Sequence, residues 1–246
     1  MKTLAFACAL VGASLAFAAN ENEDYGGVVT VWPKDHGTFL FVDCQSAVPD
    51  AVVAKPIDAL LREFNIDIRK VAGSTDPIDV RKIPAELKGL GANGGIWIVN
   101  DSALPATLAA TEDGWGVLNV AQLVADSPAP EKLEKRMFKF VNRLFANLNG
   151  IGDSTMMPAC VMKQAVGVAG VDALVCATYS PEANSKVAGY LAKAGYKKRR
   201  TGYYYDACEQ GWAPAPTNDV QKKIWDEVHQ MPTKPIKILP PSKQKK

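Results

Sequence analysis

Apolar and polar residues alternate along the chain with periods that change from segment to segment. Residues 38–44 are almost continuously apolar, as in a strand that is buried on both faces of a sheet, and residues 66–71 alternate as in a second strand. Between them, residues 51–64 repeat apolar side chains every three or four positions, which predicts a helix. The three segments therefore predict a β-α-β unit with a right-handed crossover.

Two more strands and the strongest helix of the chain follow. We expect a short helix at residues 83–90 and strands at 95–101 and 116–123. Ser127 is suited to cap the next helix and Pro128 to be its first residue. Its apolar stripe consists of Leu133, Met137, Phe140, Val141, Leu144, Phe145 and Leu148. A stripe with this spacing predicts a helix face that packs in the core.

The C-terminal part is basic and aromatic. Residues 181–196 and 218–229 predict helices, whereas residues 197–246 otherwise form a Tyr- and Pro-rich extension. Residues 186–246 carry 13 Lys and Arg against 5 Asp and Glu, and residues 19–185 carry 14 against 21. The basic segment suits an acidic surface, and we expect that surface to be the acidic part of the same chain.

The first residues are typical of an export signal. Lys2 precedes an apolar stretch that ends in the A-x-A cleavage pattern at Ala18, so residues 1–18 predict a signal peptide. A polar leader, residues 19–37, would follow. No later apolar run is long enough to span a membrane as a helix. We therefore expect a periplasmic or extracellular protein without a transmembrane segment.

Four cysteines remain after residue 18: Cys44, Cys160, Cys176 and Cys208. An even number in an oxidising compartment suits disulfide bonds, and four cysteines allow three pairings. Buried free thiols are the alternative.

The long helix and the turn after it resemble the active-site helix of metzincin zinc proteases. Those enzymes carry H-E-x-x-H-x-x-G-x-x-H, in which three histidines bind zinc and the glutamate is the general base. Arg143, Asn147 and Asp153 stand at the three histidines. Leu144 stands at the glutamate, and only Gly150 is retained.

The resemblance is closest to the archaemetzincins, whose pattern continues with cysteines and a C-x-M motif. Cys160 and Met162 match C-x-M, and Cys176 matches the first member of the last cysteine pair. Ser154 and Tyr179 stand where the family has its other two cysteines. The spacing also differs, with one extra residue before Cys160 and a shorter loop after Met162. The resemblance covers residues 38–196.

The resemblance implies an α+β, zincin-like fold, in which a mixed β-sheet packs against helices that include the degenerate active-site helix. It also implies that Cys160 and Cys176 lie close enough for a disulfide, which leaves Cys44 to pair with Cys208. In the family, a cleft beside the helix holds an extended peptide, and this chain could retain that groove without the metal.

The chain lacks the ligands of a catalytic zinc site. Such a site takes three protein ligands and an open position for water, but the only histidines are His36 and His229. Asn147 and Asp153 are oxygen donors, yet an amide and a carboxylate in such positions usually form local hydrogen bonds. We therefore expect no metal, no other cofactor and no catalytic residue.

These observations predict an exported, inactive metalloprotease-like protein that binds a protein or peptide or acts in assembly. One alternative is a secreted hydrolase whose non-standard site uses His36 or His229, although no G-x-S-x-G motif is present. A structural cell-envelope protein is the other. Nucleic acid is not an expected partner, because an exported protein seldom meets it.

Overall fold

The computed structural model describes residues 25–44, 48–74, 76–154 and 159–230. The chain divides into a large unit, Trp32–Arg199, and a small unit composed of Met1–Val31 and Arg200–Lys246. The large unit contains the predicted domain, residues 38–196, and a few residues beyond both of its ends. The predicted signal peptide and the last 16 residues lie outside the described residues.

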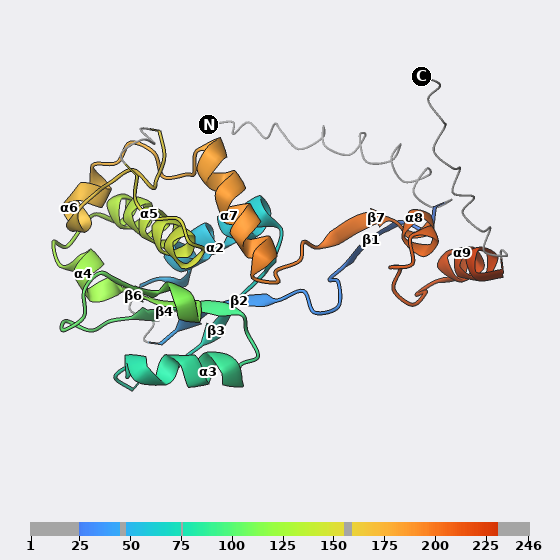
Figure 1. The fold of residues 1–246 in the computed structure, drawn as a ribbon, viewed down its shortest axis with the longest axis horizontal. Coiled ribbons are helices and arrows are strands. Elements are labelled where there is room, and N and C mark those ends of the chain that lie inside the picture. Colours follow the sequence, from blue (N-terminus) through green and yellow to red (C-terminus); the bar gives the residue numbers. More distant parts are fainter. Residues whose placement is uncertain (1–24, 45–47, 75, 155–158, 231–246) are drawn as a thin grey trace, which may run out of the picture. The chain divides into compact units, whose positions relative to one another are not determined.

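The large unit is built around a mixed five-stranded sheet in the order β3-β2-β4-β6-β5 (Figure 1). Its strands are β2 (Thr38–Asp43), β3 (Asp67–Ala72), β4 (Gly94–Val99), β5 (Thr107–Ala110) and β6 (Trp115–Asn119). The first four in spatial order are parallel, and β5 lies antiparallel to β6 at the edge. The mixed sheet agrees with the predicted α+β class.

Helices cover both faces of this sheet. The helices are α2 (Asp50–Phe64), α3 (Ile83–Gly89), α4 (Val120–Val124), α5 (Pro130–Leu148), α6 (Gly167–Asp172) and α7 (Pro181–Lys193). Short 3-10 turns occur at Val80–Lys82 and Thr111–Asp113. Helices α2, α5 and α7 lie over one face and α3 over the other (Figure 1). The β2-α2-β3 segment is parallel, as predicted.

Two apolar layers hold the sheet between the helices. In β4, Ile96 and Ile98 belong to the layer under α2, α5 and α7, whereas Trp97 and Val99 belong to the layer under α3. Alternate side chains of one strand therefore enter different layers, which explains its continuously apolar sequence. The apolar stripe of α5 packs into the first layer as predicted. Phe145 of that stripe contacts Phe39 of β2 at a ring-centroid distance of 4.9 Å.

The structure corrects the predicted strand at 116–123, because β6 ends at Asn119 and the chain continues as α4. The Asn119 side chain accepts a hydrogen bond from the backbone N–H of Ala121 and donates to the carbonyls of Asp101 and Leu104 at 2.6 and 2.7 Å. A buried asparagine thus caps the helix, where the apolar sequence alone suggested a continued strand.

The start of the long helix also differs from the prediction. Helix α5 begins at Pro130, and Ser127 has a φ of 48° in the turn that follows α4. A residue in this left-handed conformation is not the N-cap of α5, and Pro130 takes the position that suits proline at the first turn. Sequence analysis also missed β5, which is only four residues long.

The small unit contains an antiparallel pair of strands and two helices. Its elements are β1 (Val28–Val31), β7 (Arg200–Tyr203), α8 (Tyr204–Glu209) and α9 (Asp219–Gln230). Its core consists of Tyr204, Cys208 and Ile224. Sequence analysis treated the leader and the extension as separate regions, whereas the structure pairs a strand of one with a strand of the other. None of the helices in the described part of the chain has the length and apolar character needed to cross a bilayer.

Candidate functional site

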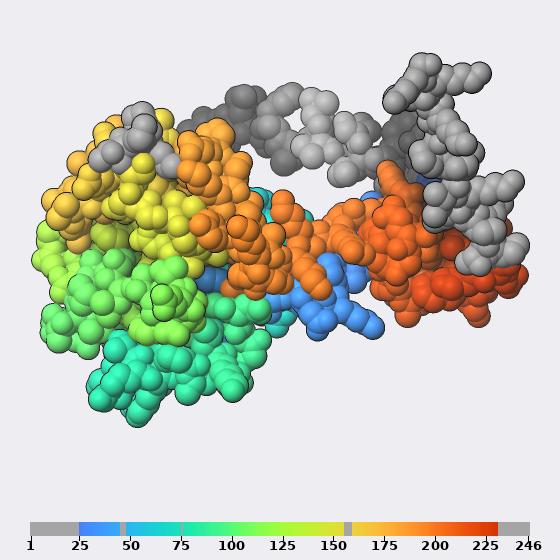
Figure 2. Space-filling view, in the orientation of Figure 1, coloured from blue at the N-terminus to red at the C-terminus, as the bar shows by residue number. Residues whose placement is uncertain are grey.

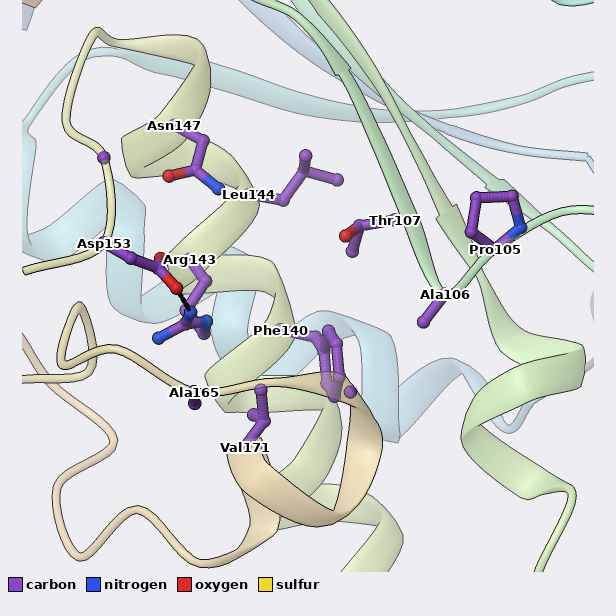
Figure 3. A pocket seen from close by; sticks show the side chains of 12 residues that line it. Pro105, Ala106, Thr107, Phe140, Arg143, Leu144, Asn147, Asp153, Ala165 and Val171 are labelled. Carbon is purple, nitrogen blue, oxygen red and sulfur yellow. Dashed lines mark hydrogen bonds and ion pairs between the residues drawn. The ribbon is translucent and has the colours of Figure 1, made fainter.

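A cavity of about 540 Å³ lies between the edge strand and the long helix of the large unit (Figure 3). Thr107, the first residue of the edge strand, and Ala106, the residue before it, line this cavity on one side. Arg143 and Asn147 line it from α5, and Asp153 from the segment after the helix. All three residues that align with the histidines of the metzincin pattern therefore line one cavity.

Arg143 and Asp153 form an ion pair at this cavity, drawn as the dashed line in Figure 3. The Arg143 side chain is 8% exposed, and its Nη1 atom donates to the carbonyls of Val161 and Lys163 at 2.6 and 2.8 Å. The two residues that align with the first and third histidines of the motif are thus a cation and its counter-ion. Arg143 connects α5 both to the segment after it and to the loop that carries the C-x-M motif.

Leu144 is 1% exposed and belongs to the main apolar layer. A Cβ atom built on Gly116 of β6 would lie 3.0 Å from its Cδ1 atom, so the leucine packs directly on the sheet. The residue at the place of the catalytic glutamate is therefore a core side chain, and it carries no group that could accept a proton.

Asn147 is half-buried, and Gly150 forms the turn after the helix. The carbonyl of Asn147 accepts a hydrogen bond from the Thr111 hydroxyl at 3.3 Å. Gly150 has a φ of 76°, and a Cβ atom there would lie 3.0 Å from the ring of Tyr190. Both the left-handed backbone and the close ring require glycine, which explains why this part of the pattern is retained.

The C-x-M loop runs through the core beside α5. Met162 is fully buried, and its carbonyl accepts a hydrogen bond from the backbone of Ser154 at 2.8 Å. The Cys160 sulfur accepts hydrogen bonds from the backbone N–H groups of Met162 and Ser180 at 3.4 and 3.2 Å. The loop is therefore held by backbone contacts on both sides.

Sequence analysis missed a buried polar face of α5 that extends this network. Arg136 is 1% exposed and forms ion pairs with Asp126 and Asp172, which raise the pKa of its guanidinium. Lys139, whose pKa is lowered by burial, donates to the carbonyls of Asp172 and Leu174 at 2.9 and 2.6 Å. The signal in the sequence was the spacing of Arg136, Lys139 and Arg143, which places three cations on one side of the helix.

The edge strand β5 has backbone groups for which the described residues supply no partner. The carbonyl of Ala106 accepts a hydrogen bond from the backbone of Asn119 at 2.9 Å, and the register continues with Leu108 opposite Val117. Because hydrogen-bonded pairs alternate in an antiparallel ladder, Thr107 and Ala109 direct their backbone groups away from β6. In the space-filling view, the green segment with β5 lies against the yellow segment at the end of α5 (Figure 2).

Among the described residues, neither histidine forms a hydrogen bond with a serine, threonine or cysteine side chain. His36 bonds to Asp67 at 2.9 Å and stacks on Trp32. His229 bonds to the carbonyl of Trp225 at 2.8 Å and stacks on the ring of the same residue. The contacts of both histidines are structural.

All four described cysteines are free thiols, so neither implied disulfide is formed in the structure. Cys44 belongs to the apolar layer under α3, and Cys208 belongs to the core of the small unit. Cys160 is buried and bonded to backbone N–H groups, whereas Cys176 is half-buried. Each buried cysteine packs as a small apolar side chain in its own core.

The donor set at the cavity does not fit a catalytic zinc ion. The guanidinium of Arg143 has only donor groups, and Leu144 has no polar atom in its side chain, so neither can ligate zinc. The carboxylate of Asp153 already accepts from Arg143. Among the described residues, no group of three His, Cys, Asp or Glu side chains could hold a metal ion.

Known protein families and curated sequences give no match to this chain. Solved structures do. The archaemetzincin from Methanopyrus kandleri matches with a TM-score of 0.54 at 15% identity, over 66% of this chain and 99% of its own. A zinc-dependent peptidase from Methanocorpusculum labreanum matches with a TM-score of 0.49 at 12% identity, over 61% of this chain and 100% of its own. The chain therefore has an archaemetzincin-like fold, which agrees with the resemblance seen at its long helix.

Proposed function

We propose that this protein is exported, has lost peptidase activity, and binds an extended segment of another protein in the cleft between β5 and α5. The observation that carries the proposal is the Arg143–Asp153 ion pair, which stands with the buried Leu144 where the family has its zinc ligands and general base.

Loss of activity follows from the chemistry of these side chains. A metalloprotease uses its metal to activate water and a carboxylate to accept the proton. Leu144 cannot accept a proton, and the guanidinium of Arg143 repels a second cation. A single substitution would not restore the site, because the ion pair and the core packing would both have to change.

Binding is supported by the edge strand. The backbone groups of Thr107 and Ala109 face away from β6, and an extended peptide could pair with them as a further strand. The cavity under this edge combines the small side chains of Ala106 and Ala165 with the polar Asn147. Backbone pairing would give affinity, and the small pockets would select the side chains.

Export is supported by the sequence of residues 1–18 alone. The apolar stretch and the A-x-A pattern have the order of a cleaved signal. Mass spectrometry of the protein secreted by an export-competent host would show an N-terminus near residue 19 if the proposal is right, and Met1 if it is wrong.

The first functional test measures metal content and turnover together. Elemental mass spectrometry of protein purified without chelators should find no stoichiometric zinc. Labelled casein should remain intact when it is incubated with a high concentration of the protein. One zinc ion per chain, or casein cleavage that a chelator stops, would refute the loss of activity.

The second test measures binding by fluorescence anisotropy, with a library of labelled, unstructured ten-residue peptides as the probe. Ala109→Pro removes a backbone N–H that β6 does not use, so it should weaken binding at least about 10-fold without loss of the fold. Glu112→Ala, an exposed change just after the strand, is the matched control and should bind normally. Equal binding by both variants would place the ligand elsewhere.

A further inference from the structure

The two strands of the small unit form a sheet whose outer edges differ in charge. Strand β1 has the sequence Val-Val-Thr-Val, with neither a charge nor a proline. Strand β7 begins with Arg200 and directly follows the basic residues 197–199. Charged side chains, especially lysines, are the usual protection of a sheet edge against pairing with another chain. The β7 edge has this protection, and the β1 edge does not.

The register shows which backbone groups lie at the unprotected edge. The N–H of Tyr204 donates to the carbonyl of Gly27 at 2.9 Å, and Val29 stands opposite Gly202. Because hydrogen-bonded pairs alternate, Val28 and Thr30 direct their N–H and C=O groups away from β7. The described residues supply no backbone partner for these groups.

The side chains of this small sheet are covered on one face only. Val29 packs on the core of Cys208 and Ile224. On the other face, Val28 is 59% exposed and its partner Tyr203 is 41% exposed. Packing on α8 and α9 supports the two strands from the covered face. The β1 edge therefore combines hydrogen-bonding groups that have no partner among the described residues with an uncharged, partly exposed face.

We propose that β1 pairs antiparallel with β1 of a second copy of this chain, so that two small units share one four-stranded sheet. A two-fold axis at Val29 places Val28 opposite Thr30 of the second copy and Val29 opposite its own counterpart. This register brings the free N–H and C=O groups of both copies together and sets no charge against another.

The chemistry of the edge favours a second copy over other strands. A strand added at the β7 edge would instead lie beside Arg200 and the basic residues before it, which are the kind of side chain that protects an edge from pairing. The β1 strand is complementary to itself, because its apolar Val29 meets an apolar residue on the covered face. The contact is short, and interfaces below about 1,000 Å² are weak or transient, so we expect dissociation in the micromolar to millimolar range.

Sedimentation velocity over a concentration series tests this proposal with two matched variants. Thr30 and Thr201 stand opposite each other on the exposed face, with hydroxyls 3.2 Å apart, but Thr30 belongs to the free β1 edge. Thr30→Lys should weaken self-association at least about 10-fold by protecting that edge, whereas Thr201→Lys should leave it within about 2-fold.

Three outcomes would overturn the proposal. The protein could remain monomeric to millimolar concentration, or both lysine variants could weaken association equally. Truncation after Gln230 could also change the dissociation constant more than about 10-fold, which would mean that the C-terminal residues, not a second copy, occupy or form this edge in the full chain. The test does not depend on the cleft of the large unit, since neither threonine lines it.

Discussion

Removal of the Arg143 side chain should destabilise the large unit by about 2–5 kcal/mol. Arg143→Ala leaves the buried carbonyl of Val161 and the part-buried carbonyl of Lys163 without their donor, and each acceptor left unsatisfied costs about 1–2 kcal/mol. The Asp153 side chain is 32% exposed, so water can hydrate its carboxylate, and loss of the ion pair adds about 1 kcal/mol or less. The two carbonyls therefore dominate the expected cost.

Asp153→Ala should cost less, because it leaves the guanidinium with two of its three partners. We expect about 1–2 kcal/mol, and a coupling energy of about 1 kcal/mol between the two positions in a double-mutant cycle. Asn147→Ala is the matched control on the same helix, since no side-chain hydrogen bond of Asn147 occurs among the described residues, and it should stay within about 0.5 kcal/mol.

Urea unfolding, monitored by the far-ultraviolet circular dichroism of the full chain, gives these differences as shifts of the midpoint at constant slope. An Arg143→Ala variant that loses less than about 1 kcal/mol would refute the claim that the guanidinium connects α5 to the C-x-M loop. A double-mutant cycle without coupling would refute the ion pair itself.

Three further predictions follow from the burial of single groups. Leu144→Glu should cost at least about 3 kcal/mol in urea unfolding, because it removes a core side chain and buries a carboxylate; wild-type stability would show that the site can accept a base. Burial raises the pKa of Asp67, but bonds from Arg69, His36 and Thr38 outweigh it and lower the pKa overall, so its stabilisation is present above about pH 4 and lost as the pH falls through the lowered value. The stability difference between wild type and Asp67→Asn should accordingly shrink below that pH, and a constant difference would contradict this. Burial, aided by Glu86 and Asp43, raises the pKa of Cys44 to about 11, so iodoacetamide at pH 8 should modify the half-buried Cys176 first; protection of both thiols until reduction would show a disulfide.

Sequence patterns were sufficient where burial repeats regularly. The period of the long helix follows from its own residues, because α5 lies against one apolar layer along most of its length. The β2-α2-β3 unit was predictable for the same reason, since each of its elements buries a complete stripe or face. The role of Gly150 could be read from the sequence, because the turn after a helix often requires one residue with a positive φ, which glycine adopts most easily.

Local exceptions could not be predicted, because distant residues decide them. The side chain of Asn119 bonds to carbonyls at Asp101 and Leu104, far from it in sequence, and thereby ends β6 early. The four residues of β5 carry too little pattern to be recognised, and only their pairing with β6 makes them a strand. The partner of β1 lies 169 or more residues away, so its pairing with β7 is a tertiary event.

The sequence by itself determined which chemistry is missing from the site, because Arg143, Leu144 and the two histidines of the chain exclude a three-histidine zinc centre wherever they lie. Only the tertiary structure decided which contacts the residues at these positions make. Arg143 and Asp153 are ten residues apart, and their pairing depends on the bend after α5 and on the loop whose carbonyls orient the guanidinium. Residue types fix the available donors and acceptors, whereas packing of distant segments fixes which of them meet.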